Sequence, residues 1–442
     1  MNLRLKSFFA LRARAAVFAA CVIAACAHVA PREPSGAGGA DAASENLGGY
    51  WDLVARLDLD HAMLAAQAGH SHDQEALAGA LKRVVAGDAA RAIVSLDSLA
   101  RRTYTDSTVR RVAVVVLAGL LHTEHRWSEL AVLPTVPGIH RDSADLAGVE
   151  AWAAAFDGVR APHSRFRSDS VIFPIVLSPL GVPMLPVEIN GKRFLFWLDT
   201  GASMTMISAD VARAVGIAPR TPDSLEAVTA VGRVRVLPAL IGSLHIGPLD
   251  WSDAPAMIVG GGDFSVADSA AAGRMSRAKI DGIIGWDVLR QLDVRIDHPR
   301  GTLTMRKPVH EHLAASRRNL FWIGYPIVQG QSVNGAKLNL GLDTGLQATF
   351  VTRSLASLSG GIVLGVERRR LASIAGDSIV RGDVLNEVRL RVGDADLLLR
   401  GVTVQTAVSA GFVVLDGVIG SDVGFAGVVR IDATNGVFSV KP

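Results

Sequence analysis

The chain is poor in cysteine and in charge of one sign. Its two cysteines, Cys21 and Cys26, lie in the first 26 of 442 residues. The rest of the chain therefore has neither a disulfide framework nor a thiol nucleophile. Its 45 Lys and Arg and 42 Asp and Glu give a formal charge of +3, which offers no electrostatic reason to expect nucleic acid as a partner.

Long apolar runs and metal motifs are scarce too. Beyond the N-terminal segment the longest apolar run, Val112–Leu121, is well short of the roughly 20 residues of a membrane-spanning helix, and we predict a buried helix there. His70, His72, His122 and His125 lack the His-Glu-x-x-His spacing of a zinc site, and we interpret them as solvated helix ends. We expect no metal and no cofactor.

The N-terminal segment predicts export. In residues 1–25, four basic residues precede an acid-free apolar run, which is the layout of a secretory signal peptide. Small residues directly before Cys26 resemble the bacterial lipobox, so we expect Cys26 to be lipidated and to hold the protein on a membrane, facing the periplasm or the cell surface. Cleavage of an ordinary signal peptide nearby is the alternative. Residues 26–46, rich in Pro, Gly, Ala and Ser, predict a flexible tether.

Residues 47–165 have a helical pattern. Apolar residues recur at three- and four-residue spacing, as at Leu81, Val84 and Val85, which predicts helical hairpins. The segment from Gly87 resembles the start of a tetratricopeptide helix, and a second unit is expected from Arg126. The two are 39 residues apart, more than the period of about 34 for that repeat, so a generic helical domain is the alternative.

After residue 165 the chain changes to short Val-, Ile- and Leu-rich runs bounded by turn residues, which predicts an all-β region. Within it three landmarks recur in the same order: Asp199-Thr200-Gly201 as Asp343-Thr344-Gly345, Asp281–Asp287 as Asp416–Asp422, and Val294–Asp297 as Val429–Asp432. An internal duplication into two lobes explains this recurrence.

Each copy predicts a carboxylate at the end of a buried strand. An Asn-Gly hairpin turn is followed by a strand, at 194–198 and 338–342, and then by the Asp-Thr-Gly triplet. An aspartate after such an apolar strand is costly to bury without partners or a function. Two copies related by a pseudo-twofold axis would bring Asp199 and Asp343 together. The later Ile-Ile-Gly and Val-Ile-Gly segments predict a second buried strand with a glycine for close backbone approach.

These motifs resemble those of a retropepsin-like bacterial aspartic protease with two fused lobes, from about residue 170 to the end. The resemblance implies that Asp199 and Asp343 share a proton and activate a water for peptide hydrolysis without a metal. The positions that the resemblance implies as support for this pair are Thr200 and Thr344, which lock the loops together, Gly201 and Gly345, which donate backbone N–H groups, and Ser203, whose hydroxyl bonds an outer carboxylate oxygen.

The second copy departs from the family pattern, with Leu346 and Gln347 where a small hydroxyl residue is usual. A non-catalytic peptide-binding lipoprotein with a degenerate protease fold is therefore an open alternative, as is a protease that cuts a single partner. Hairpins around Gly232 and Gly376 are flap candidates, and their apolar residues favour extended hydrophobic peptides.

The sequence thus predicts a multidomain α plus all-β protein that acts as an aspartic endopeptidase on a peptide or protein substrate. Because one chain supplies both lobes, we expect a monomer. The expected divisions are a signal peptide at 1–25, a tether at 26–46, helical hairpins at 47–165, lobe 1 at 170–308, a linker at 309–319 and lobe 2 at 320–442.

Overall fold

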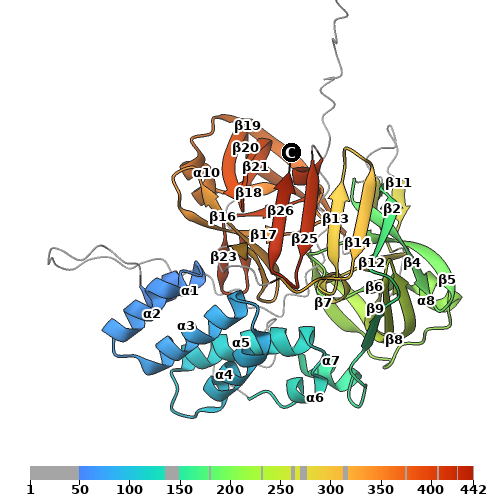
Figure 1. Ribbon diagram of the computed structural model, residues 1–442, viewed down its shortest axis with the longest axis horizontal. Coiled ribbons are helices and arrows are strands. Elements are labelled where there is room, and N and C mark those ends of the chain that lie inside the picture. The colour runs from blue at the N-terminus through green and yellow to red at the C-terminus, as the bar shows by residue number, and fades with distance from the viewer. Residues whose placement is uncertain are drawn as a thin grey trace, which may run out of the picture.

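The computed structural model describes residues 49–134, 149–178, 181–229, 232–259, 264–268, 276–311, 317–373, 376–405, 408–425 and 427–441. The predicted signal peptide at 1–25 and the predicted tether at 26–46, including Cys26, lie outside them. None of the described helices is long and apolar enough to cross a membrane. Figure 1 shows the helices of residues 50–155 gathered at one end of the molecule, against two β lobes.

The helical region predicted from residue spacing is present. Its helices are α1 (Tyr50–Ala55), α2 (Leu59–Ala68), α3 (His72–Val85), α4 (Ala89–Arg101), α5 (Ser107–Thr123), α6 (Trp127–Leu130) and α7 (Val149–Ala155). Side chains of Ser71, Asp88 and Asp106 cap α3, α4 and α5 by accepting backbone N–H groups of the first turn. The run from Val112 to Leu121 lies in α5 and is almost entirely buried, as predicted. Because α6 has only four residues, the tetratricopeptide identity stays a prediction.

Lobe 1 is a closed barrel of six strands, in the order β9-β6-β12-β5-β4-β8 and back to β9. Strands β1, β3 and β7 extend it at its edges. The elements of this lobe are β1 (His163–Phe166), β3 (Val176–Leu177), β4 (Pro183–Ile189), β5 (Lys192–Leu198), β6 (Met206–Ser208), α8 (Ala209–Ala214), β7 (Leu225–Thr229), β8 (Gly232–Ile246), β9 (Leu249–Val259), β10 (Ser265–Asp268), β11 (Ser276–Lys279), β12 (Gly282–Ile284) and α9 (Trp286–Leu289).

Lobe 2 repeats this design, with a ring in the order β16-β17-β24-β18-β21-β20 that closes on β16. The second barrel therefore confirms the duplicated two-lobed fold. Its elements are β15 (Leu320–Trp322), β16 (Pro326–Ser332), β17 (Lys337–Leu342), β18 (Phe350–Thr352), α10 (Arg353–Ser359), β19 (Val363–Ser373), β20 (Gly376–Val392), β21 (Ala395–Gln405), β22 (Val408–Ala410), β23 (Val413–Leu415), β24 (Gly417–Ile419) and the 3-10 helix η2 (Ser421–Gly424).

A five-stranded sheet joins the lobes. It runs in the order β2 (Ser170–Pro174), β14 (Thr302–Arg306), β13 (Asp293–Asp297), β25 (Val428–Asp432) and β26 (Val437–Lys441). Here the third repeated landmark pairs with its own copy, because β13 and β25 are antiparallel with Asp293 opposite Asp432. The two lobes thus share one sheet, and their relative position is fixed by backbone hydrogen bonds.

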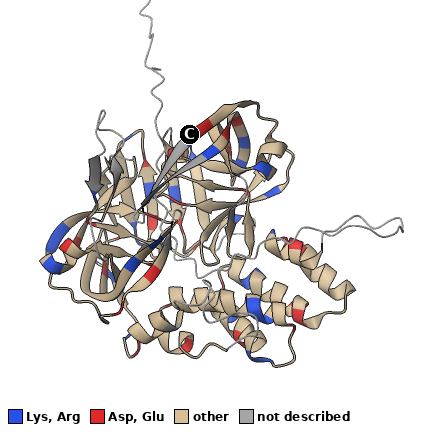
Figure 2. Cartoon of the chain, turned by 180° about the vertical axis from the view of Figure 1, so that it is seen from behind, with Lys and Arg blue, Asp and Glu red and all other residues tan. Residues whose placement is uncertain are grey.

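The helical region packs on both lobes. The Arg290 guanidinium of lobe 1 donates to Glu124 Oε1 at 2.8 Å, and Asn339 Nδ2 of lobe 2 donates to the Arg56 carbonyl at 2.7 Å. Buried apolar side chains of the helices and of both lobes form one continuous cluster. Figure 2 shows cationic and anionic residues interspersed along the helices and the lobes.

Two expectations about this region were wrong. Residues 163–165, predicted to be in the helical domain, begin the edge strand β1, which pairs with β9. Arg165 and Arg167 form ion pairs with Asp250 of β9. His122 and His125 are not solvated helix ends. They lie against Trp127, and the tertiary packing of α6, α7 and lobe 1 over the end of α5 explains their burial.

This burial makes stability depend on pH. Desolvation lowers the pKa of His122 to about 4 and that of His125 to about 3, so the folded chain keeps both rings neutral while the unfolded chain protonates them near 6.5. Their contribution to stability is present above pH 6.5 and is lost as the pH falls toward 4. The unfolding free energy should fall between pH 7 and pH 4, and we expect this fall to be about 3 kcal/mol smaller in His122→Leu than in the wild type. Denaturant titrations at the two pH values measure it. An unchanged slope would contradict this account.

Candidate active site

Each Asp-Thr-Gly triplet leaves the end of a buried strand, as predicted. The hairpin between β4 and β5 turns at Asn190 and Gly191, which both have positive φ, so the strand enters the barrel in a fixed register. At the end of β5 the Asp199 backbone N–H donates to the Ile284 carbonyl of the parallel neighbour β12 at 3.1 Å. In lobe 2 the Asp343 N–H donates to Ile419 in the same way, at 2.9 Å.

The two triplets are locked together by their threonines. The Thr200 hydroxyl donates to the Leu342 carbonyl at 3.0 Å and accepts the Thr344 N–H at 3.0 Å. In return, the Thr344 hydroxyl donates to the Leu198 carbonyl at 2.9 Å and accepts the Thr200 N–H at 3.0 Å. These four buried hydrogen bonds cross between the lobes and fix the two loops relative to each other.

The lock brings the two carboxyl groups together. Asp199 and Asp343 are each 1% exposed. A Cβ added at Gly201 would lie 2.7 Å from Cγ of Asp343, and one added at Gly345 would lie 2.5 Å from Cγ of Asp199. Each carboxyl therefore packs on the glycine of the opposite triplet, at a distance that no other residue allows.

The hydrogen bonds to the two carboxyl groups differ. Asp199 Oδ1 accepts the N–H groups of Gly201 at 2.9 Å and Ala202 at 3.3 Å. Asp199 Oδ2 is buried and has no hydrogen-bond partner among the described residues. Asp343 accepts on both oxygens: the Leu346 N–H at 3.0 Å on Oδ1, and the Tyr325 hydroxyl at 3.3 Å on Oδ2.

Burial shifts the titration of this pair. Desolvation, followed by repulsion from Asp343, raises the pKa of Asp199 well above its usual range. Desolvation also raises the pKa of Asp343, and the neighbouring Asp199 carboxyl group, the Tyr325 hydroxyl and the loop backbone oppose this rise. Because two neighbouring buried carboxyl groups repel each other when both are ionised, we expect the pair to hold one proton and to titrate as a unit.

A second pair of aspartates supports the loops, and sequence reasoning assigned it no role. Asp287 accepts the Thr205 N–H and hydroxyl, each at 2.9 Å, and Asp422 accepts those of Thr349 at 2.9 and 2.6 Å. Burial raises the pKa of Asp287 to about 6. Both residues stand in the repeated landmark two positions after its second glycine, and that equal spacing was the available signal.

Those glycines bring the backbones into contact. A Cβ at Gly285 would lie 2.7 Å from the Met204 carbonyl carbon, and one at Gly420 would lie 2.9 Å from that of Ala348. The close backbone approach expected at the Ile-Ile-Gly and Val-Ile-Gly segments is thus present in both lobes.

The expected role of Ser203 was wrong. Its hydroxyl is buried without a hydrogen-bond partner among the described residues, instead of bonding the Asp199 carboxylate. The loop turns away from the carboxyl group after Ala202, whose carbonyl accepts the Trp286 N–H at 2.6 Å.

The second copy departs from the family pattern at Leu346, but the backbone N–H of Leu346 still donates to Asp343 Oδ1.

The flap candidates lie at the turns of two hairpins. Gly232 begins β8 opposite Thr229 of β7, and Gly376 begins β20 opposite Ser373 of β19. The turn residues 230–231 and 374–375 lie outside the described part of the chain.

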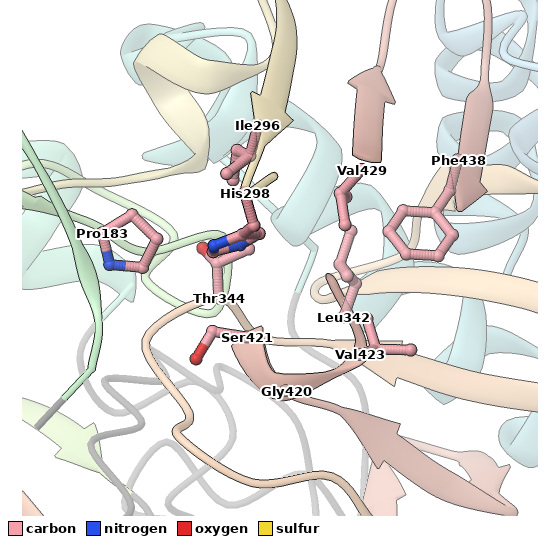
Figure 3. A pocket seen from close by; sticks show the side chains of 10 residues that line it. All are labelled: Pro183, Ile296, His298, Leu342, Thr344, Gly420, Ser421, Val423, Val429 and Phe438. Atoms are coloured by element: carbon pink, nitrogen blue, oxygen red, sulfur yellow. The ribbon is translucent and has the colours of Figure 1, made fainter. Parts of the chain in front are cut away.

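One small cavity lies behind the second triplet. Figure 3 shows Pro183, Ile296 and His298 of lobe 1 and Thr344 and Ser421 of lobe 2 around it. Its volume of about 10 Å³ suits a single water and no peptide. In the described ranges no three His, Cys, Asp or Glu side chains are placed to hold a metal ion.

Comparison with known proteins agrees with this geometry. Residues 185–291 match a family model described as "gag-polyprotein putative aspartyl protease". The matched residues lie in lobe 1 and include the triplet Asp199-Thr200-Gly201. A solved retropepsin-like aspartic protease from Rickettsia conorii is 18% identical, over 32% of this chain and 96% of that one, with a TM-score of 0.23. No curated protein matches the chain. Independently of these matches, two closed six-stranded barrels in one chain are consistent with the duplicated, two-lobed protease fold expected from the sequence.

The threonine lock yields a stability prediction. Thr200→Val removes one donated and one accepted bond and leaves the Leu342 carbonyl and the Thr344 N–H buried without partners. We expect a loss of about 3 kcal/mol in denaturant unfolding. Ser203→Ala, in the same loop, removes a hydroxyl without a partner in the described structure and should change stability by less than about 0.5 kcal/mol. Equal effects of the two substitutions would contradict the lock.

The proton-sharing pair yields a second prediction. A raised carboxyl pKa favours the unfolded chain once that chain ionises, so the cost is absent below about pH 4 and grows as the pH rises. We expect Asp199→Asn, which keeps an acceptor for Gly201, to raise the thermal unfolding midpoint at pH 7. The gain should shrink toward pH 4, as measured by calorimetry, and an equal gain at both pH values would be evidence against shared protonation.

Proposed function

We propose that this protein is an aspartic endopeptidase with its dyad at Asp199 and Asp343. The observation that carries the proposal is the pair of buried carboxyl groups, held against each other by the threonine lock. Burial and mutual repulsion favour a single shared proton on this pair. This is the arrangement in which one carboxyl acts as a general base and the other as a general acid near the working pH.

The reaction needs only a water and the peptide. The ionised carboxylate takes a proton from the water while the water oxygen bonds to the carbonyl carbon of the peptide. The protonated partner gives its proton to the carbonyl oxygen. When the tetrahedral intermediate collapses, the C–N bond breaks and the amine takes the proton held by the base. A hydroxyl of the intermediate returns its proton to the other carboxyl, so the dyad is restored.

The substrate proposal rests on the two hairpins. The flap candidates of the two lobes are the antiparallel strand pairs β7–β8 and β19–β20, which carry Gly232 and Gly376. Paired flaps over the dyad would hold an extended peptide, with hydrophobic residues favoured. One chain carries both aspartates, so we propose a monomeric enzyme.

The location of the protein is a separate proposal. The signal-like segment 1–25 and Cys26 support export and lipid anchoring, with the enzyme facing the periplasm or the cell surface. Mass spectrometry of the membrane fraction should detect a diacylated Cys26. An unmodified mature N-terminus at another residue would favour an ordinary signal peptide instead.

Cleavage of a peptide library tests the enzymatic proposal. Residues 45–442 should cut peptides in a pH-dependent manner, and a transition-state analogue such as pepstatin should inhibit the cutting. We expect Asp199→Asn and Asp343→Asn each to reduce kcat by at least about 10³-fold, because each removes one partner of the acid–base pair. Asp394→Asn, at an exposed turn, is the matched control and should keep full activity. Folded protein that cuts nothing at any pH from 3 to 8 would favour the non-catalytic peptide-binding alternative.

A further inference from the structure

The two lobes exchange a large and a small residue beside the dyad. In lobe 1 Met184 pairs with Trp197, and in lobe 2 the equivalent partners are Ile327 and Gly341. Val182 lies two residues before Met184, and Tyr325 lies two residues before Ile327. Lobe 1 thus combines the small Val182 with the large Trp197 on the strand that leads to Asp199. Lobe 2 combines the large Tyr325 with Gly341 on the strand that leads to Asp343.

The absence of a side chain at Gly341 makes room for the Tyr325 ring next to Asp343. A Cβ at Gly341 would lie 2.7 Å from Cε1 of Tyr325, so the ring occupies the space that a side chain at 341 would take. Tyr325 is 7% exposed, and its hydroxyl donates to Asp343 Oδ2 at 3.3 Å. Val182 has no hydroxyl to offer Asp199. The dyad is therefore asymmetric although its loops are duplicated.

We propose that Tyr325 is a positioning residue that holds Asp343 as the ionised member of the dyad, so that Asp343 activates the water and Asp199 Oδ2 carries the proton. This inference rests on the proposed protease function. Donors on both oxygens favour a carboxylate, whereas a buried oxygen without a donor favours a carboxylic acid. Asp343 has the first environment and Asp199 the second.

Among the described residues, the ionisable groups that shift the pKa of Asp343 are Asp199 and Tyr325, and those that shift the pKa of Tyr325 are the two aspartates. Burial and both carboxyl groups raise the pKa of Tyr325, so its hydroxyl stays protonated and remains a donor. Loss of this donor destabilises the Asp343 anion and therefore raises the pH at which it forms.

Tyrosine NMR tests the assignment without any substrate. The chain has three tyrosines, so ¹³Cζ-tyrosine labelling gives three signals, and Tyr325→Phe identifies one of them. In the wild type we expect the Tyr325 signal to move with pH as Asp343 ionises. The movement should disappear in Asp343→Asn and persist at lower pH in Asp199→Asn. A Tyr325 signal that is constant from pH 3 to 8 would overturn the proposal, whether or not the protein cuts peptides.

Kinetics supply the second readout. In Tyr325→Phe we expect the acidic limb of the kcat/KM profile to move up by about one pH unit and kcat to fall about tenfold, with KM little changed. Tyr50→Phe is the matched control, because Tyr50 is also buried and donates its hydroxyl to the Gln74 carbonyl at 2.6 Å, within the helical region. Its pH profile should equal the wild-type profile. An unshifted profile in folded Tyr325→Phe would overturn the positioning role, whereas an inactive wild type would overturn the protease proposal alone.

Discussion

Two carboxyl groups buried face to face are the constraint on which the rest of the molecule depends. Such a pair repels itself once both members ionise, so the surrounding structure must oppose their separation. The threonine lock opposes it with four hydrogen bonds between the lobes. Gly201 and Gly345 leave the space that the carboxyl groups need. The shared sheet adds the β13–β25 pairing, so the lobes cannot drift apart without breaking a backbone ladder.

A duplicated fold delivers two equal halves, whereas acid–base catalysis needs two unequal ones. The loops, the threonines and the supporting Asp287 and Asp422 are nearly symmetric. The asymmetry comes from packing behind the loops, where Gly341 makes room for Tyr325. A change of side-chain volume thus becomes a difference in hydrogen bonding, and through it a difference in charge between the two carboxyl groups.

The sequence predicted the features that depend on local patterning. The Asn-Gly turns and the apolar runs set strand positions within one or two residues, and the repeat gave the second lobe from the first. It failed where tertiary packing decides. The burial of His122 and His125 depends on helices and a lobe that come later in the chain. Tyr325 is 18 residues from Asp343 in the sequence, so local patterning does not connect them. Only an alignment of the two copies at Pro183 and Pro326 would have shown that Tyr325 takes the place of Val182.

The helical region belongs to the same physical unit as the dyad. A Cβ on Gly119 of α5 would lie 3.8 Å from the Gly324 Cα, so the helix passes close to the turn that carries Tyr325. That turn has a left-handed glycine and no further backbone pairing beyond the Ile323 N–H on the Tyr325 carbonyl at 3.2 Å among the described residues. Packing against α5 therefore restrains it. Loss of the helices would expose the apolar side chains that both lobes contribute to the shared cluster, and it would remove the contact of α5 with this turn.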